Sequence, residues 1–150
     1  MTDWRDNLIE TPAQIGQLIA AASRIAVLGI KTEARADQPA FYVPRYLAKA
    51  GFTIVPVPVY YPEATQILGQ PVFRSLAAIP GPIDIVQVFR RPADIPQHLE
   101  DILAKRPGAV WFQAGIRNDA VAEALAMAGI KVVQDHCLMV EHRERQVVSR

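Results

Sequence analysis

Largely apolar runs recur along the chain, and stretches with helical spacing separate them. Runs that do not alternate with polar positions are typical of strands buried on both faces of a parallel sheet. We therefore predict five buried strands. They lie at Ile25–Gly29, Phe52–Val57, Ile83–Phe89, Ala109–Phe112 and Ile130–Val133.

The stretches around these runs place apolar residues on one face of a helix. Thr11 followed by Pro12 predicts a helix start, because a hydroxyl N-cap is followed by proline in the first turn. A second helix ends at Gly51, and we expect it to start near Pro44 or to be kinked there. Two further helices and a short helical turn complete the prediction, at residues 95–103, 118–129 and Ser75–Ile79.

Strands that alternate with helices predict right-handed crossovers between neighbouring strands. We expect a single Rossmann-like, doubly wound α/β domain, with a mainly parallel five-stranded sheet and helices on both faces. A chain of 150 residues is long enough for one such domain. Residues 1–23 are expected to form an N-terminal helical extension, and residues 143–150 a charged tail.

The composition narrows the range of functions. Hydrophobic residues make up 51% of the chain and the net charge is +1, which argues against a nucleic-acid-binding module. No apolar run approaches the roughly 18 residues that cross a membrane, and the first residues do not resemble a secretion signal. We expect a cytoplasmic protein without a membrane partner, in which local cations hold any anionic ligand.

The carboxyl ends of parallel strands are the usual ligand-binding edge of such a sheet. Gly29 ends the first strand, where a glycine lets a phosphate approach the backbone closely. The loop up to Pro39 lacks the other glycines of a G-x-G-x-x-G fingerprint, but it carries Lys31 and Arg35. This loop is therefore an incomplete phosphate-binding motif with two cations.

Two further cations follow the third predicted strand. Arg90 and Arg91 come directly after the apolar run, so both lie at its carboxyl end. A guanidinium group at that place can contact phosphate oxygens through two hydrogen bonds. The alternative is a solvated pair, or an ion pair with Asp94.

The end of the second predicted strand separates two classes of nucleotide. Folds that bind NAD carry an acidic residue there, which bonds the ribose hydroxyls. Residues 55–59 are instead apolar throughout. The rigid Val57-Pro58 pair can form an apolar seat for adenine, or it can be a buried strand whose prolines only shape its exit. An acidic residue at this strand end would repel a ribose 3′-phosphate, and none is present. Coenzyme A therefore fits this strand end better than NAD.

Several segments together resemble the CoA-binding domain family, which includes small stand-alone relatives of a domain in the succinyl-CoA synthetase α subunit. The resemblance runs from about Ile25 to His142 and rests most on Phe-Arg-Arg-Pro at 89–92 and Trp-x-Gln-x-Gly at 111–115. It implies a site for CoA or acyl-CoA at the first loop, the Val57-Pro58 turn, the Phe89-Arg90 strand end and the Gln113–Gly115 loop. The predicted ligand-binding residues are Gly29, Ile30, Lys31, Arg35, Val57, Pro58, Phe89, Arg90, Arg91, Gln113 and Gly115.

The chain departs from the family pattern at two places near the predicted phosphates. The family usually has a serine soon after the first-strand glycine and another after the proline that opens the next helix. This chain has Lys31 and Ala40 there, so two hydroxyl donors are lost and one cation is gained. The family's C-terminal pattern is also altered, at His136 and Met139.

Polar and reactive residues near the C-terminus do not predict catalysis or a metal site. The spacing Cys137-x4-His142 falls short of the four ligands of a structural zinc site, and nucleophilic catalysis by Cys137 needs a positioned base. We expect Asp135 to cap the last helix and Cys137 to pack beneath the sheet. The family's synthetases use a phosphorylatable histidine in a second domain, for which this chain is too short.

We therefore expect non-catalytic binding of CoA or an acyl-CoA, with a homodimer or a partner enzyme subunit as possible assemblies. Two alternatives stay open. One is a small NAD(P)-linked oxidoreductase, against which the missing glycines and ribose-binding acid count. The other is a regulatory or interaction protein with a vestigial nucleotide pocket, which Lys31 and Ala40 would suit.

Overall fold

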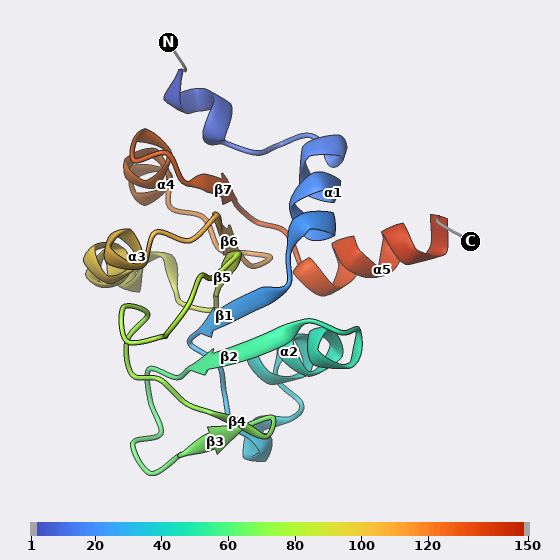
Figure 1. The fold of residues 1–150 in the computed structure, drawn as a ribbon, viewed down its shortest axis with the longest axis vertical. Coiled ribbons are helices and arrows are strands. Elements are labelled where there is room, and N and C mark those ends of the chain that lie inside the picture. The colour runs from blue at the N-terminus through green and yellow to red at the C-terminus, as the bar shows by residue number, and fades with distance from the viewer. Residues whose placement is uncertain (1–2, 149–150) are drawn as a thin grey trace.

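The computed structural model describes residues 3–148 and has the predicted α/β architecture (Figure 1). Five parallel strands form one sheet in the order β2-β1-β5-β6-β7. Their bounds are β1 Arg24–Leu28, β2 Thr53–Val57, β5 Ile85–Val88, β6 Ala109–Phe112 and β7 Lys131–Val133. The strand order reverses between β1 and β5, which is where doubly wound folds bind their ligands.

Five helices cover the two faces of this sheet (Figure 1). They are α1 Pro12–Ala21, α2 Pro39–Lys49, α3 Leu99–Lys105, α4 Asp119–Met127 and α5 Leu138–Val148. Short 3₁₀ turns lie at η1 Trp4–Asn7, η2 Glu33–Arg35, η3 Pro92–Asp94 and η4 Pro96–His98. Among the described residues, no helix has the length and apolar character needed to cross a bilayer.

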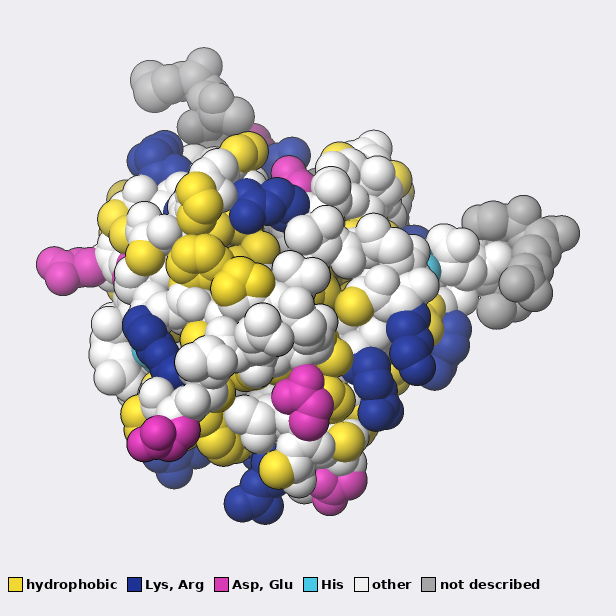
Figure 2. All heavy atoms as spheres, turned by 60° about the horizontal axis from the view of Figure 1, so that its bottom comes forward, with side chains coloured by type: hydrophobic (Ala, Val, Ile, Leu, Met, Phe, Trp, Pro, Cys, Tyr) yellow, Lys and Arg dark blue, Asp and Glu magenta, His cyan; other side chains and the backbone are white. Residues whose placement is uncertain are grey.

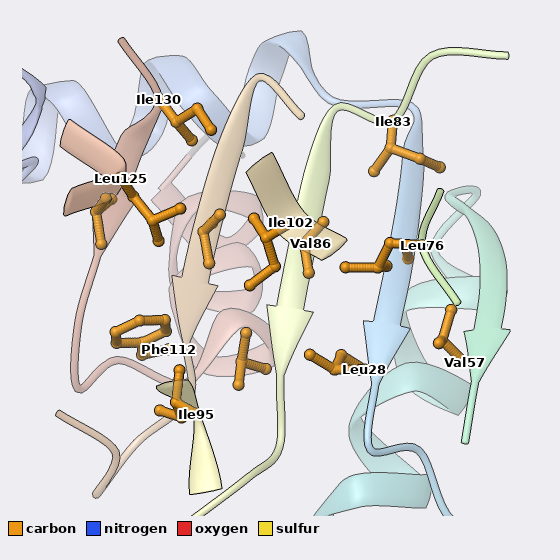
Figure 3. Close-up of a cluster of buried hydrophobic side chains, with 14 of the residues drawn as sticks. Leu28, Val57, Leu76, Ile83, Val86, Ile95, Ile102, Phe112, Leu125 and Ile130 are labelled. Atoms are coloured by element: carbon orange, nitrogen blue, oxygen red, sulfur yellow. The ribbon is translucent and has the colours of Figure 1, made fainter. Parts of the chain in front are cut away.

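Each face of the sheet has its own hydrophobic core, because successive side chains of a strand point to opposite faces. Ala26 and Leu28 pack with residues of α3 and α4, among them Ile102 and Leu125 (Figure 3). The intervening strand residues pack with residues of α1, α2 and α5. The uninterrupted apolar runs of the sequence reflect this burial from both sides.

Both edges of the sheet have a neighbouring segment. Leu8 makes a parallel bridge to Val132 of the edge strand β7, and the N–H of Ile9 donates to the Val132 carbonyl at 2.8 Å. At the other edge, the N–H of Phe73 donates to the carbonyl of Pro56 in β2 at 2.9 Å. These contacts satisfy backbone groups that would otherwise be open to another chain.

Helix α2 differs from its prediction. It begins at Pro39 and includes Pro44 in its interior, so it does not start near Pro44. Pro44 has no N–H to donate to the carbonyl of Ala40, four residues earlier. That carbonyl instead accepts the N–H of Lys31 at 3.1 Å, which fastens the loop after β1 to the helix.

The connection between β2 and β5 also differs from the prediction. It contains a two-stranded antiparallel hairpin, β3 Gln66–Ile67 and β4 Gln70–Pro71, that the sequence pattern did not indicate. Residues 75–79 form a turn and not a helical segment. The carboxylate of Asp101 accepts the N–H groups of Leu76 and Ala77 at 2.6 and 3.0 Å, and the N–H of Ile79 donates to the Leu76 carbonyl at 3.1 Å.

Candidate functional site

Gly29 joins three strand ends at the point where the strand order reverses. Its N–H donates to the carbonyl of Val57 at 2.9 Å, at the end of β2. Its φ is +88°, and a Cβ atom built on it would lie 2.3 Å from the carbonyl oxygen of Phe89. Both the backbone conformation and this close approach require glycine. Glycine is therefore needed here for the turn and for packing against the end of β5, and its contact with a ligand stays a prediction.

Arg90 lies beside Gly29 and is held from two sides. Its side chain is buried, with the whole residue only 9% exposed. Nε donates to Nε2 of His98 at 3.1 Å, and Nη1 donates to the hydroxyl of Tyr60 at 3.4 Å. The guanidinium carbon also lies 5.6 Å from the centroid of the Tyr60 ring. Nη2 has no hydrogen-bond partner in the described part of the chain, so it can still bind an anion.

His98 keeps its imidazole neutral beside this cation. Burial lowers the pKa of His98, and the charge of Arg90 lowers it further, while Asp101 and Asp94 act in the opposite direction. The ring nitrogen that accepts from Arg90 must be unprotonated, which agrees with a neutral ring.

Tyr60 sits on the loop that follows β2 and is 63% exposed. Arg74 holds this loop by donating from Nη1 to the carbonyl of Tyr60 and from Nη2 to the carbonyls of Tyr61 and Ala64, at 2.8–3.2 Å. An exposed aromatic ring is thereby fixed next to the buried guanidinium of Arg90.

The other predicted cations differ in their availability. The side chains of Lys31 and Arg35 have no polar partner within residues 3–148, and Arg35 is exposed in η2. Arg91 is exposed and forms an ion pair with Asp94 at 2.9 Å, which is the alternative that its sequence position left open. On the face shown in Figure 2, basic side chains are dispersed and acidic ones lie among them. Local cations, and not a broad positive field, must therefore attract an anion to this region.

The apolar members of the predicted site form its floor. Ile30 is 1% exposed and belongs to the core beneath α2, so only its backbone can reach a ligand. Val57 and Pro58 are buried, and Phe89 packs against the same core as Ile30. These residues shape the site and offer no hydrogen-bonding side chain.

The side chain of Gln113 is oriented by two donors. Its Oε1 accepts the N–H of Leu138 at the start of α5 at 3.3 Å and Nε2 of Gln87 at 3.1 Å. Since a backbone N–H can only donate, Leu138 fixes which end of each amide faces the other. Oε1 of Gln87 is consequently left buried without a partner. Nε2 of Gln113 has no bond to the described residues and stays available at the strand end.

The expected cap of the last helix is wrong. The carboxylate of Asp135 accepts the N–H of Gly115 at 2.6 Å, and therefore engages the predicted ligand loop and not α5. Gln113 supplies the side-chain oxygen at the helix N-terminus instead. Cys137 is half-buried and packs against the core on the α1, α2 and α5 face.

The polar residues near the start of α5 bond to one another. Nδ1 of His136 lies 3.5 Å from a carboxylate oxygen of Glu141, whose other oxygen pairs with Arg145 at 3.0 Å. No three His, Cys, Asp or Glu side chains of residues 3–148 are grouped so that they could hold a metal ion.

The order of the strands defines a doubly wound α/β domain, and the glycine turn and the buried arginine mark a candidate ligand site where that order reverses. A family model described as "CoA binding domain" matches residues 23–143. The chain belongs to this CoA-binding domain family.

Relatives of similar length support this membership. The chain is 35% identical over 130 residues to the uncharacterized protein YneT of Bacillus subtilis (strain 168), covering 87% of this chain and 93% of that protein. The structure of cell-free ID.343 from Thermus thermophilus is 40% identical, with a TM-score of 0.82 and coverage of 90% and 98%.

A more distant structure shows the same fold inside a larger enzyme. A dinucleotide-forming acetyl-coenzyme A synthetase of Ca. Korarchaeum cryptofilum matches with a TM-score of 0.61 at 15% identity. The match covers 73% of this chain and 25% of that enzyme. At this identity the likeness concerns the fold alone.

Proposed function

We propose that this protein binds coenzyme A or an acyl-CoA without covalent attachment and without catalysing a reaction. The observation that carries the proposal is the buried guanidinium of Arg90, oriented by two side chains and set against the Gly29 turn. A buried cation with an unpartnered edge at this end of a doubly wound sheet fits a phosphate group. Membership of the CoA-binding domain family supports coenzyme A as the source of that phosphate.

The ligand would lie across the carboxyl ends of four strands. Adenine would rest on Val57-Pro58 and stack against the exposed ring of Tyr60. The diphosphate would meet Gly29 and Arg90, with Lys31 nearby as a second cation. The pantetheine arm would then pass the free Nε2 group of Gln113.

The same geometry disfavours a nicotinamide cofactor. Residues 55–59 are apolar, so no carboxylate stands at the end of β2 to accept the ribose hydroxyls. The carboxylate of Glu33, in the loop after β1, accepts the N–H of Leu68 at 2.8 Å. We expect NAD and NADP to bind more weakly than CoA for this reason.

Thermal unfolding in the presence of CoA, dephospho-CoA, NAD and NADP tests the proposal. A ligand at 100 times its dissociation constant should stabilise the fold by about 2.7 kcal/mol. We expect CoA to give the largest shift. Equal shifts with CoA and dephospho-CoA would mean that the 3′-phosphate is not recognised, and no shift with any CoA compound would overturn the proposal.

Arg90→Ala locates the site by calorimetry. Loss of a hydrogen-bonded charge is expected to weaken CoA binding by about 10- to 100-fold. Arg143→Ala is the matched control, since Arg143 is an exposed arginine on α5. Equal affinities for the two variants would contradict this placement of the ligand.

A further inference from the structure

The contact between Arg90 and His98 constrains the protonation of both groups. Arg90 has no accepting atom, so its Nε–H donates and Nε2 of His98 accepts, at 3.1 Å. A histidine that accepts at Nε2 carries its single proton on Nδ1. A doubly protonated imidazole could not accept at all, and it would place a second cation against the guanidinium.

We propose that His98 is a positioning residue: its neutral ring orients the guanidinium of Arg90 toward the ligand's phosphates, and protonation of His98 releases that guanidinium and weakens binding. This inference rests on the proposed function, since it concerns the same anion site. Nothing in the sequence motifs pointed to His98, which lies eight positions after Arg90 and on a different element.

The groups around His98 do not supply a hydrogen-bonded counter-ion for its charged form. The carboxylate of Asp101 in α3 already accepts the N–H groups of Leu76 and Ala77. Asp94 in η3 pairs with Arg91. Both carboxylates favour protonation at longer range, whereas burial and Arg90 oppose it and dominate, so the pKa of His98 lies below its ordinary value.

The aromatic partner cannot replace the imidazole. Tyr60 receives Nη1 of Arg90 at 3.4 Å, a longer contact than the one from Nε to His98. Tyr60 is 63% exposed as a whole residue, so it lies at the solvent side of the guanidinium. His98 is therefore the inner support of Arg90, and its loss would let the guanidinium turn outward.

Calorimetry with dephospho-CoA between pH 8 and pH 5 tests this role. The diphosphate of that compound is esterified on both sides, so the probe itself does not titrate in this range. We expect the affinity of the unaltered protein to fall as the pH is lowered toward 5, because the charged form of His98 becomes populated, and to fall by at most the roughly tenfold loss expected for His98→Leu. Circular dichroism at each pH verifies that the protein is folded.

Two substitutions separate positioning from packing. His98→Gln keeps an accepting oxygen that does not titrate, so we expect near-normal affinity at pH 8 and a flat profile down to pH 5. His98→Leu fills similar space without an acceptor, and we expect about tenfold weaker binding at every pH. His142→Gln is the control, because His142 is remote from the site, and it should keep the pH profile of the unaltered protein.

The outcomes separate this inference from the proposed function. If the unaltered protein binds dephospho-CoA and His98→Gln keeps its pH profile, the positioning role is overturned while CoA binding stands. A rise in affinity on acidification would also overturn it, because charged His98 would then be binding phosphate directly. Failure of both CoA and dephospho-CoA to bind at any pH would overturn the proposed function. Nitrogen-15 NMR of the ligand-free protein then still tests the contact, since a proton on Nε2 of His98 would contradict it.

Discussion

The two ends of the sheet each hold a shielded histidine, and the two differ in what faces them. His98 lies at the carboxyl end, where its Nε2 accepts from a guanidinium. His142 lies near the amino ends of β1 and β2, where its Nδ1 is 2.8 Å from the hydroxyl of Tyr46. Phe52 and Tyr46 also contact the His142 ring edge-on. Burial is the main cause that lowers the pKa of both histidines.

The comparison shows that the groups around a histidine, and not the histidine itself, determine which property its protonation changes. At the carboxyl end, a charge on His98 acts on a cation that is available to a ligand. At the amino end, a charge on His142 acts on an aromatic cluster beside a cavity of about 300 Å³ lined mainly by small and apolar residues. We therefore expect protonation of His98 to alter binding and protonation of His142 to alter stability alone.

Gly29→Ala is expected to have the largest effect. Its Cβ would lie 2.3 Å from the Phe89 carbonyl oxygen at a φ of +88°. Strain and overlap together should lower the free energy of unfolding by about 3 kcal/mol or more. At the amino end, Gly51 has a φ of +107° but open space around it, so Gly51→Ala should cost only about 1–2 kcal/mol. Urea unfolding of both variants measures the difference, and equal losses would contradict the close approach at Gly29.

Tyr60→Ala sharpens the comparison from the ligand side. Removing the ring should weaken CoA binding by about 1–3 kcal/mol, because a base loses its stacking partner. Tyr60→Phe keeps the ring and loses only the long contact from Arg90, so most of the affinity should remain. Calorimetry of the two variants checks this order. Equal losses of affinity would show that the hydroxyl, and not the ring, recognises the ligand.

Tyr46→Phe removes a hydroxyl at the amino end, as Tyr60→Phe does at the carboxyl end, and tests whether that end contributes to stability and not to binding. The variant leaves Nδ1 of His142 without its partner, and should lower the free energy of unfolding by about 1 kcal/mol. The affinity for CoA should stay within twofold of the unaltered protein, since Tyr46 is remote from the site. Denaturation and titration of one preparation measure both quantities. A large fall in affinity would show that the two ends are not separate in function.

The smallest expected effect concerns stability against pH. A histidine whose pKa is lower in the folded state leaves more protons on the unfolded chain, so stability falls as the pH drops below about 6.5. His142→Gln should make this fall less steep, by at most about 1.4 kcal/mol per pH unit, the limit for one proton. Thermal unfolding between pH 8 and pH 5 gives the slope. An unchanged slope would contradict the shielding of His142.

The sequence predicted the strand-end residues of the candidate site better than the residues that contact them from loops and turns. Gly29 and Arg90 could be found because each follows an apolar run, and the ends of parallel strands meet at one edge. Tyr60 and His98 could not be found, because their contact with Arg90 depends on the path of a loop and of a 3₁₀ turn, which leave no periodic signal.

Predictions from local sequence rules differed from the structure where a group distant in sequence forms the hydrogen bond to a backbone N–H or carbonyl. Asp135 stands where a helix cap is expected, yet it bonds the N–H of Gly115. The first N–H groups of the turn at residues 75–79 bond the carboxylate of Asp101, which lies in another element. Pro44 predicted a start or a kink near itself, whereas α2 begins at Pro39, and the Ala40 carbonyl that Pro44 cannot serve accepts from Lys31.

The Ala40 carbonyl couples the two ends of the sheet through α2. Its bond to the N–H of Lys31 ties the loop at the carboxyl end to the first turn of α2, and Tyr46, on the same helix, touches His142 at the amino end. The six helical steps from Ala40 to Tyr46 span about 9 Å along the axis of α2. The carbonyl that Pro44 leaves without a helical partner thus connects α2 to the loop after β1. A shift of α2 would therefore displace groups at both ends of the sheet.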